Sequence, residues 1–377
     1  MSMNRTLGTL IVFASASLAL QGALAQEKGS APQALTLSGE YAGTHDPSIA
    51  VDHGKYYVFA TGAVRPPRVE SAPPAPPVPG TARPSTAQLP QLAIRCSPDL
   101  KVWKRCGAIF PSIPIWIQQM SPETQELWAP DVSYFDGLYH LYYAFSAFGK
   151  NTSGIALATN ETLDPSSPKY TWVDRGLVLR SLATDDFNAI DPNLILDSKG
   201  EAYLSFGSFW TGIKMRHLDR HTGLLSKTDE KLYSLASRRP GSLAQPRNPN
   251  LPPDTEAIEA PFVFQHGGYY YLFVSWDLCC RGLKSTYRTM VGRSTSVTGP
   301  YVDRDGKPML EGGGSPLLQA NGQWLGPGGE SLLHLDHEDL IVFHAYSATD
   351  GHPALHISTL GWKDGWPEAA LEGDSAK

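Results

Sequence analysis

Three carboxylates stand in sequence surroundings that suit acid–base chemistry. Asp46 lies in the polar run Thr44-His45-Asp46-Pro47-Ser48, which favours an ionised side chain. Glu259 lies in the apolar run Ala257-Ile258-Glu259-Ala260-Pro261, which should raise its pKa and keep it protonated. Asp191, between Ile190 and Pro192, could hold the proton of such an acid in place. One ionised and one protonated carboxylate are the minimum for cleaving a glycosidic bond, so the three residues predict that chemistry.

Five segments of the chain repeat one pattern: an acidic residue, a short apolar strand, a tight Gly or Asp turn, and a strand usually rich in Tyr or Phe. The acidic residues are Asp46, Asp131, Asp191, Glu259 and Glu330, spaced 85, 60, 68 and 71 residues apart. The first interval contains a Pro- and Ala-rich insertion, residues 65–91, which cannot form a central strand. Each remaining unit is long enough for a four-stranded sheet, so the spacing predicts an all-β fold, a five-bladed β-propeller. A β-sandwich with coincidental spacing is the alternative.

The repeat also predicts where the carboxylates lie. The innermost strand of a propeller blade runs along the central channel, so residues at one repeat position converge on one rim. Asp46, Asp191 and Glu259 precede the Tyr of the following strand by 10 residues or slightly more, which predicts a shared register. An Asp before Pro is also a common turn residue, but three such acidic runs in one register favour catalysis. Asp131 is offset by one or two positions, and we assign it and Glu330 to blade architecture or solvent contact.

The composition narrows the class of partner. The chain has 31 basic and 37 acidic residues and no basic block, which argues against a nucleic-acid partner. Its 9 Trp, 16 Tyr and 13 Phe favour strands and leave aromatic faces free to stack on a ligand. Trp128, Trp210 and Phe148 lie near the acidic segments and are candidates for stacking on a sugar, with Trp276 as a further candidate. Most other aromatic side chains should form the core between blades.

The first residues have the pattern of an export signal. Arg5 precedes an apolar run from Leu7 to Leu20, and Ala23-Leu24-Ala25 offers a cleavage site. We therefore predict a signal peptide at residues 1–25 and a single catalytic propeller at residues 26–377, secreted or periplasmic. A retained membrane anchor is the alternative. No other segment is apolar enough to cross a bilayer, so no membrane partner is expected.

The 4 cysteines form two close pairs. Cys96 and Cys106 flank a segment that resembles a hairpin, so they could form a cross-strand disulfide. Cys279 and Cys280 are adjacent and could form a vicinal disulfide or remain two buried thiols. None of these spacings is typical of a zinc site.

Several runs of residues resemble glycoside hydrolase family 43, and within it the arabinan endo-1,5-α-L-arabinosidases. These runs, between Gly43 and Pro367, include His45-Asp46-Pro47-Ser48, Leu127-Trp128-Ala129-Pro130-Asp131, Ala189-Ile190-Asp191-Pro192-Asn193, Phe206-Gly207-Ser208-Phe209-Trp210, Ala257-Ile258-Glu259-Ala260-Pro261 and Cys279-Cys280-Arg281-Gly282. The resemblance implies a five-bladed β-propeller, inversion at the anomeric centre, and arabinan or an arabino-oligosaccharide as substrate. It implies that Asp46 is the general base, that Glu259 is the general acid, and that Asp191 tunes and orients the acid. The predicted substrate-binding residues are Trp128 and Ser208, which match cleft-lining positions of the family, together with Trp210, Asn188 and Phe148.

One departure from the family concerns metal. Many arabinanases of the family carry a metal-binding His after the Gly-Pro-Gly of the last blade, where this chain has Gly329. We therefore expect no metal ligands and no cofactor in the chemistry, with at most a weakly bound structural calcium ion. His344 is the nearest replacement by sequence, but it is more simply a core histidine with a hydrogen-bond partner.

A second departure concerns the mode of action. The insertion at residues 65–91 lies near the expected cleft rim, so an exo-acting α-L-arabinofuranosidase or a β-xylosidase is an alternative. A second alternative is a propeller that only binds glycan, although such a protein would not need three carboxylates at one repeat position. The expected protein is a monomer.

Overall fold

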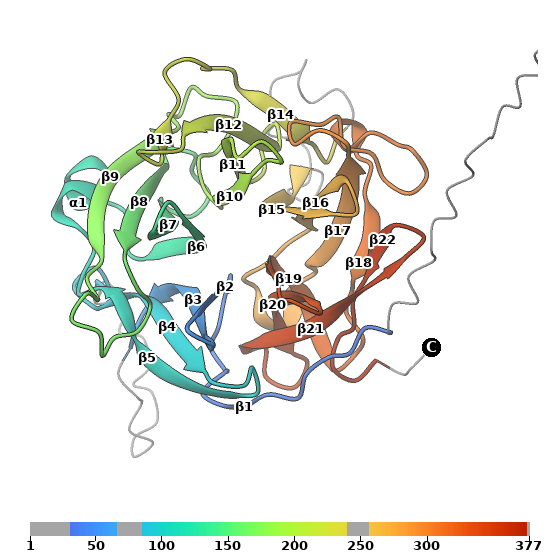
Figure 1. Ribbon diagram of the computed structural model, residues 1–377, viewed down its shortest axis with the longest axis horizontal. Helices are drawn as coiled ribbons and strands as arrows, with labels where there is room; N and C mark the ends of the chain where they lie inside the picture. Colours follow the sequence, from blue (N-terminus) through green and yellow to red (C-terminus); the bar gives the residue numbers. More distant parts are fainter. Residues whose placement is uncertain (1–30, 66–84, 240–255, 375–377) are drawn as a thin grey trace, which may run out of the picture.

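Five β-sheets are arranged in a ring around a central axis in the computed structural model (Figure 1), which describes residues 31–65, 85–239 and 256–374. Each sheet is a blade built from consecutive strands. Blade 1 contains β2 (Ser48–Asp52), β3 (Lys55–Ala63), β4 (Gln91–Ser97) and β5 (Val102–Phe110), and blade 2 contains β6 (Leu127–Phe135), β7 (Leu138–Phe145), β8 (Gly154–Asn160) and β9 (Val173–Arg180). Blade 3 contains β10 (Asn193–Leu196), β11 (Ala202–Phe206), β12 (Ile213–Asp219), β13 (Leu224–Leu225) and β14 (Tyr233–Ala236). Blade 4 contains β15 (Ile258–His266), β16 (Tyr269–Trp276), β17 (Arg288–Ser294) and β18 (Ser315–Leu318), and blade 5 contains β19 (Trp324–His334), β20 (Asp339–Ser347), β21 (Pro353–Lys363) and β22 (Trp366–Glu368). The predicted five-bladed β-propeller is confirmed.

The second strand of a blade is enclosed on both faces, which explains its apolar sequence. β7 and β16 are buried from their second residue onward, so they do not alternate between polar and apolar side chains. Phe59 on β3 and Leu141 on β7 belong to one hydrophobic cluster, which joins blade 1 to blade 2. Burial of such side chains stabilises each blade against its neighbour by about 25 cal/mol per Å² of apolar surface.

One backbone irregularity recurs at the inner end of every blade. Asp46, Ala129, Asp191, Ala260 and Gly329 all have left-handed φ values, from 41° to 60°. Each of these five residues, called here the channel positions, lies two residues before a residue that pairs with the second strand of its blade. The left-handed conformation costs a residue other than Gly about 1–2 kcal/mol. Four of these positions therefore place local backbone strain beside the channel, as is common at functional sites.

The N-terminal segment closes the ring between blade 5 and blade 1. The Leu35 N–H donates to the Ile357 carbonyl of β21, and β1 (Ser38–Gly39) pairs in parallel with β5 in blade 1. The segment therefore holds together the first and last blades, which are joined by no loop of their own. The predicted disulfide between Cys96 and Cys106 is confirmed and joins β4 to β5.

The predicted insertion, residues 65–91, is shorter in the structure. Residues 66–84 lie outside the described residues, as does the predicted signal peptide, residues 1–25. Ala87 is buried in the core of blades 1 and 2, its carbonyl accepts the Ile113 N–H, and Gln91 begins β4. The prediction was therefore wrong at its C-terminal boundary, because residues 85–91 belong to the fold.

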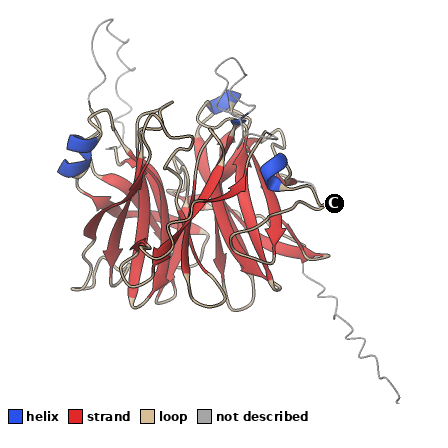
Figure 2. Cartoon of the chain, turned by 90° about the horizontal axis from the view of Figure 1, so that it is seen from above, coloured by secondary structure: helices blue, strands red, loops and turns tan. Residues whose placement is uncertain are grey.

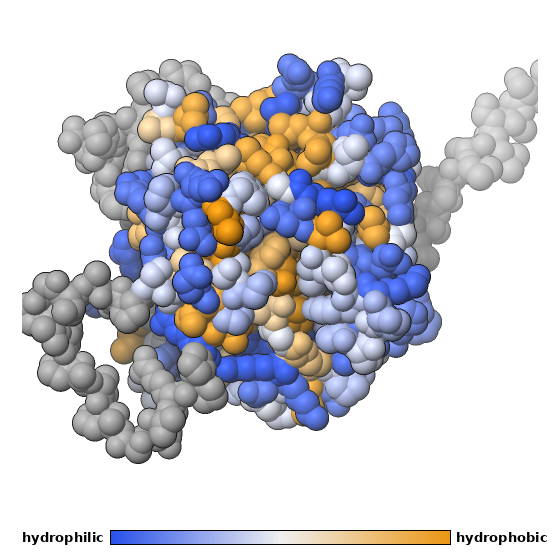
Figure 3. Space-filling view, turned by 90° about the vertical axis from the view of Figure 1, so that its left-hand side faces the viewer, coloured by the Kyte–Doolittle hydropathy of each residue, from blue (hydrophilic) through white to orange (hydrophobic). Residues whose placement is uncertain are grey.

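The helices are short and lie outside the blades. In the part of the chain that the structure describes, they are α1 (Ile115–Met120) and the 3-10 turns η3 (Gly282–Lys284) and η4 (Met309–Glu311). Figure 2 shows helical segments, in blue, toward one end of the ring. Within the described residues, no helix has both the length and the apolar character needed to cross a membrane. Hydrophilic and hydrophobic residues are interspersed on the outer side of the propeller that Figure 3 shows.

Candidate active site

A cleft of about 760 Å³ lies over the centre of the ring and is lined by residues of all five blades. Its lining includes every predicted site residue: Asp46, Asp191, Glu259, Trp128, Ser208, Trp210, Asn188 and Phe148. The three carboxylates come from blades 1, 3 and 4, so only the closed ring brings them together. The structure therefore brings the three predicted carboxyl groups into one cleft.

Asp46 lies at the start of blade 1, and its neighbours favour the carboxylate. Oδ2 accepts the Thr61 hydroxyl at 2.6 Å and lies 2.9 Å from His45 Nδ1. Burial opposes ionisation, but the adjacent His45 and the Thr61 hydroxyl outweigh it and hold the pKa of Asp46 well below its usual range. Asp46 is therefore ionised at neutral pH, as its polar sequence predicts.

Glu259 has the opposite environment. Its side chain accepts hydrogen bonds from the hydroxyl groups of Ser208, at 2.6 Å, and of Tyr287. Burial raises the pKa of Glu259, the two hydroxyl donors partly offset this effect, and the charge of Asp46 adds to it. One cleft thus contains a carboxyl group with a lowered pKa, Asp46, and another with a raised pKa, Glu259.

Asp191 lies beside the segment that carries Glu259. Its Oδ2 accepts the backbone N–H of Ala260 at 3.1 Å, directly after Glu259 in the chain. Burial raises the pKa of Asp191 well above its usual value, and the charges of Glu259 and Asp46 raise it further. Asp191 can therefore orient the segment that carries Glu259.

The predicted shared register is correct for Asp46 and Asp191 but wrong for Glu259. Asp46 and Asp191 occupy channel positions, whereas Ala260 occupies that position in blade 4 and Glu259 precedes it by one residue. β15 changes register between Glu259 and Phe262, which allows the Glu259 side chain to reach the same cleft from its earlier position. Counting residues back from the next Tyr does not reveal this bulge.

Asp131 and Glu330 line a narrower space, about 30 Å³, in the channel among the channel positions. Asp131 accepts hydrogen bonds from Asn193 and from the Leu194 N–H, and Glu330 accepts them from Ser275 and Thr289. Both carboxyl groups are buried, and burial raises the pKa of each to about 7. They belong to blade architecture, as predicted, rather than to solvent.

We expect the raised pKa of Glu330 to appear in folding stability. Between its unfolded pKa, about 4.5, and its folded pKa, about 7, the native state binds more protons than the unfolded state, so stability falls as pH rises through this window. Glu330→Gln should remove about 3 kcal/mol of that decline, since one pKa unit corresponds to about 1.4 kcal/mol. Denaturant unfolding at pH 4.5 and pH 8 measures the difference. An unchanged pH dependence in the variant would contradict the assignment.

The predicted substrate-binding residues differ in how they reach the cleft. Phe148 is 83% exposed, and Trp128 and Trp210 are partly exposed, so these rings can contact a sugar. Ser208 and Asn188 are buried: Ser208 donates to Glu259, and Asn188 Oδ1 accepts the Ser153 hydroxyl. These two therefore support the floor of the cleft.

Trp276, the further aromatic candidate, does not reach the cleft. It is 6% exposed and packs in the hydrophobic cluster of blades 3 and 4. The Arg238 guanidinium lies 4.0 Å from the centroid of its ring. The interpretation of Trp276 as a sugar-stacking residue was wrong, since its position at the end of β16 faces the core.

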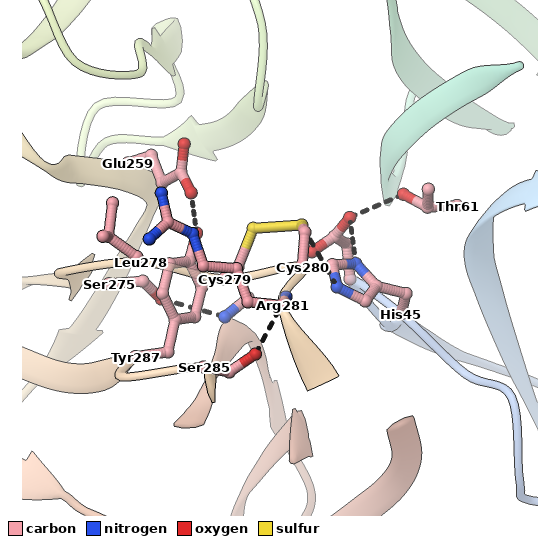
Figure 4. Close-up of a disulfide and its surroundings, with 12 residues drawn as sticks. His45, Thr61, Glu259, Ser275, Leu278, Cys279, Cys280, Arg281, Ser285 and Tyr287 are labelled. Atoms are coloured by element: carbon pink, nitrogen blue, oxygen red, sulfur yellow. Dashed lines mark hydrogen bonds and ion pairs between the residues drawn. A yellow bond between two sulfur atoms is a disulfide. The ribbon is translucent and has the colours of Figure 1, made fainter. Parts of the chain in front are cut away.

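Sequence analysis missed four neighbours of the carboxylates: Thr61, Tyr287, His45 and Tyr346, all of which line the cleft. His45 adjoins Asp46 in the His-Asp-Pro-Ser run, so a signal was available for it. Tyr287 and Tyr346 stand in no acidic run, and only the arrangement of blades 4 and 5 brings them to the site. The adjacent Cys279 and Cys280, also in the cleft wall, form a vicinal disulfide rather than two buried thiols (Figure 4).

The described residues do not fit the metal site of the family. Gly329 carries no ligand, and a Cβ there would lie 2.6 Å from Asp46 Oδ1 and 2.9 Å from His344 Nδ1. His45, Asp46 and His344 bring ligand-type atoms within 4.8 Å of one another, but these atoms already pair with each other. His344 Nδ1 accepts the Asp46 N–H, so His344 has a hydrogen-bond partner in the core, in line with the simpler prediction.

A five-bladed propeller with two carboxyl groups in a shared cleft, one with a lowered pKa and one with a raised pKa, is the arrangement of a glycoside hydrolase. Comparison with known proteins narrows this class. The family model for "Glycosyl hydrolases family 43" matches residues 41–367, and the chain belongs to this family.

Two curated relatives and one solved structure illustrate the similarity. The extracellular endo-alpha-(1->5)-L-arabinanase 1 of Bacillus subtilis is 44% identical over 278 residues, 73% of this chain and 79% of the relative. The extracellular exo-alpha-(1->5)-L-arabinofuranosidase ArbA of Cellvibrio japonicus is 38% identical over 342 residues, 89% of this chain and 88% of the relative. The structure of Cellvibrio cellulosa alpha-L-arabinanase complexed with arabinohexaose has a TM-score of 0.74 and 37% identity, covering 88% of this chain and 96% of that chain.

Proposed function

We propose that this protein is an inverting, endo-acting hydrolase of the α-1,5-L-arabinofuranosidic bonds of arabinan. The observation that carries the proposal is the opposite tuning of Asp46 and Glu259 within one cleft. The substrate class is supported by relatives named as arabinanases, one of them solved with arabinohexaose. The exposed ring of Phe148 and the partly exposed rings of Trp128 and Trp210 supply apolar faces for furanose rings.

In the proposed reaction, Glu259 donates its proton to the oxygen of the departing sugar while water attacks the anomeric carbon from the opposite face. Asp46 takes a proton from that water, so the new C–O bond forms with inverted configuration. Asp191 accepts the Ala260 amide and thereby holds the Glu259 segment. Ser208 and Tyr287 fix the orientation of the Glu259 carboxyl group.

The configuration of the first product tests this mechanism. Proton NMR at early times, before mutarotation, should show the anomer opposite to that of the substrate bond. Net retention would refute a single displacement in which Asp46 activates water. It would instead require a covalent glycosyl–enzyme intermediate.

The products released from debranched arabinan distinguish endo from exo action. A cleft lined by all five blades suits a polymer lying across the ring, so we expect mixed oligosaccharides at early times. Deleting residues 66–84, and not the anchored residues 85–91, should leave this pattern unchanged. The opposite result would be a wild-type enzyme that releases one fixed product, as an exo-acting enzyme does, and a deletion variant that releases mixed oligosaccharides. That result would show that the insertion blocks the cleft.

We also propose that the reaction needs no metal. The chain has Gly329 where many arabinanases of the family carry a metal-binding His, and two carboxylates are sufficient for the chemistry. Treatment with a chelator should leave most of the activity and remove at most a weakly bound structural calcium. Loss of nearly all activity, restored by calcium, would overturn this proposal.

Export from the cell is proposed on two grounds: the N-terminal pattern of residues 1–25 and the extracellular names of the relatives. N-terminal sequencing of the protein recovered outside the cytoplasm should begin at residue 26. Size-exclusion chromatography of the same material tests the expected monomer.

A further inference from the structure

The Cys279–Cys280 disulfide lies in the cleft wall beside the residues that surround Asp46 (Figure 4). It belongs to a loop between β16 and η3 that is closed at its base by the Thr286 N–H donating to the Leu278 carbonyl at 2.8 Å. Cys280 has a left-handed φ of 66°, and its Sγ lies 3.7 Å from His45 Nε2. The disulfide links two consecutive residues of this turn and so restricts the direction of the Cys280 amide.

A continuous chain of polar contacts leads from that amide to Asp46. The Cys280 N–H donates to Tyr346 Oη at 2.9 Å, Tyr346 Oη lies 2.6 Å from His45 Nε2, and His45 Nδ1 lies 2.9 Å from Asp46 Oδ2. These contacts connect blade 4, blade 5 and blade 1. The side chains of His45 and Asp46 are only 19% and 22% exposed, so little water competes for them.

The Cys280 amide determines which group donates and which accepts along this series of polar contacts. Because this N–H occupies Tyr346 Oη as an acceptor, the tyrosine proton is free to point to Nε2 of a neutral His45. The proton of the neutral ring then lies on Nδ1, which is 2.9 Å from Asp46 Oδ2. Protonation of His45 adds a proton at Nε2 and leaves the Nδ1 proton in place.

We propose that Tyr346 and the Cys279–Cys280 turn are positioning residues that hold His45 with its proton on Nδ1, so that His45 orients Asp46 and maintains its ionised form. The proposal rests on the proposed function, in which Asp46 activates water. The Cys279–Cys280 disulfide lies near Asp46, the proposed base, unlike the Cys96–Cys106 disulfide between β4 and β5. Loss of the Cys279–Cys280 disulfide should therefore lower the rate of the catalytic step.

The other groups around His45 are consistent with this arrangement. The His344 ring stacks on His45 with centroids 3.8 Å apart, and its Nδ1 accepts the Asp46 N–H, which places the proton of neutral His344 on Nε2. Burial lowers the pKa of His344 well below its usual value, so it adds no competing positive charge. The remaining titratable groups that act on His45 are Asp46 and Glu259, and both favour a proton on the ring.

Three sets of variants test the proposal on debranched arabinan and on an aryl arabino-oligosaccharide. Tyr346→Phe and the pair Cys279→Ser/Cys280→Ser should each lower kcat about tenfold, the effect of one lost hydrogen bond, with KM within about twofold. The acid limb of their pH profiles should move to higher pH, because Asp46 loses part of the contact that keeps it ionised. The matched control is Cys96→Ala/Cys106→Ala, which removes the disulfide between β4 and β5 and should preserve both kcat and the pH profile. His45→Asn, which keeps a short N–H donor, should retain more kcat than His45→Leu.

A measurement on the resting enzyme separates this proposal from the proposed function. Nitrogen-15 NMR of labelled histidines should show neutral His45 with its proton on Nδ1, and Tyr346→Phe should shift the ring toward the other tautomer. A wild-type protein inactive on both substrates would refute the proposed function, while the tautomer measurement would still decide how His45 is held. Two results would overturn the positioning role. One is an active wild type whose Tyr346 and cysteine variants have the same kcat and pH profile. The other is a neutral His45 whose proton lies on Nε2.

Discussion

Asp46→Asn is expected to lose about 10³-fold or more of kcat/KM on arabinan. The amide cannot accept a proton from water, and general-base catalysis contributes up to about 10⁴-fold to such reactions. Asn has nearly the same shape and can still accept one hydrogen bond from Thr61 or His45, so the fold should remain intact. Initial rates on debranched arabinan, together with a melting curve, measure both effects.

Glu330→Gln is the matched control for Asp46→Asn. It also neutralises a buried carboxyl group at the channel, but one that faces Ser275 and Thr289 rather than the cleft. The control should keep wild-type activity. Comparable losses in the two variants would mean that the channel needs carboxylates for structure, and that Asp46 has no special role.

Glu259→Gln should show an effect that depends on the leaving group. On arabinan the departing sugar oxygen needs a proton, so we expect a loss of about 10²- to 10⁴-fold. On an aryl arabino-oligosaccharide with an acidic phenol the leaving group needs no proton, and the loss should be far smaller. The ratio of the two losses is the quantity to measure.

The pH dependence gives a second test of Glu259. Burial raises the pKa of this acid, and activity requires its protonated form, so wild-type activity should fall as pH rises through that pKa. The alkaline limb should be absent in Glu259→Gln acting on the aryl substrate. Equal losses on both substrates, with the alkaline limb retained, would show that Glu259 is not the acid.

The fold was predictable because its signals are local and repeated. Tyr- and Phe-rich second strands are continuously apolar since neighbouring blades cover both faces, and their spacing reveals the number of blades. The carboxylate chemistry was also predictable, because polar neighbours surround Asp46 in sequence and apolar neighbours surround Glu259, as they do in space.

Other features depend on long-range geometry that no local pattern carries. Tyr287 meets Glu259 across 28 residues, and Tyr346 meets His45 across 301. The bulge of β15 changes which residue faces the cleft without leaving a mark in the hydrophobic pattern. The C-terminal end of the Pro-rich segment was misjudged because the small side chain of Ala87 suffices to anchor it.

The five channel positions have the same left-handed backbone conformation, so the side chain at each position alone decides whether it carries a negative charge. Two of them carry Asp, and the other three carry Ala129, Ala260 and Gly329, which add no charge and little volume. The left-handed backbone therefore repeats at all five positions, whereas only those of blades 1 and 3 carry a carboxyl group. Changing the side chains of this ring, without redesigning a loop or strand, is the shortest route by which such a propeller could acquire, lose or relocate a catalytic group.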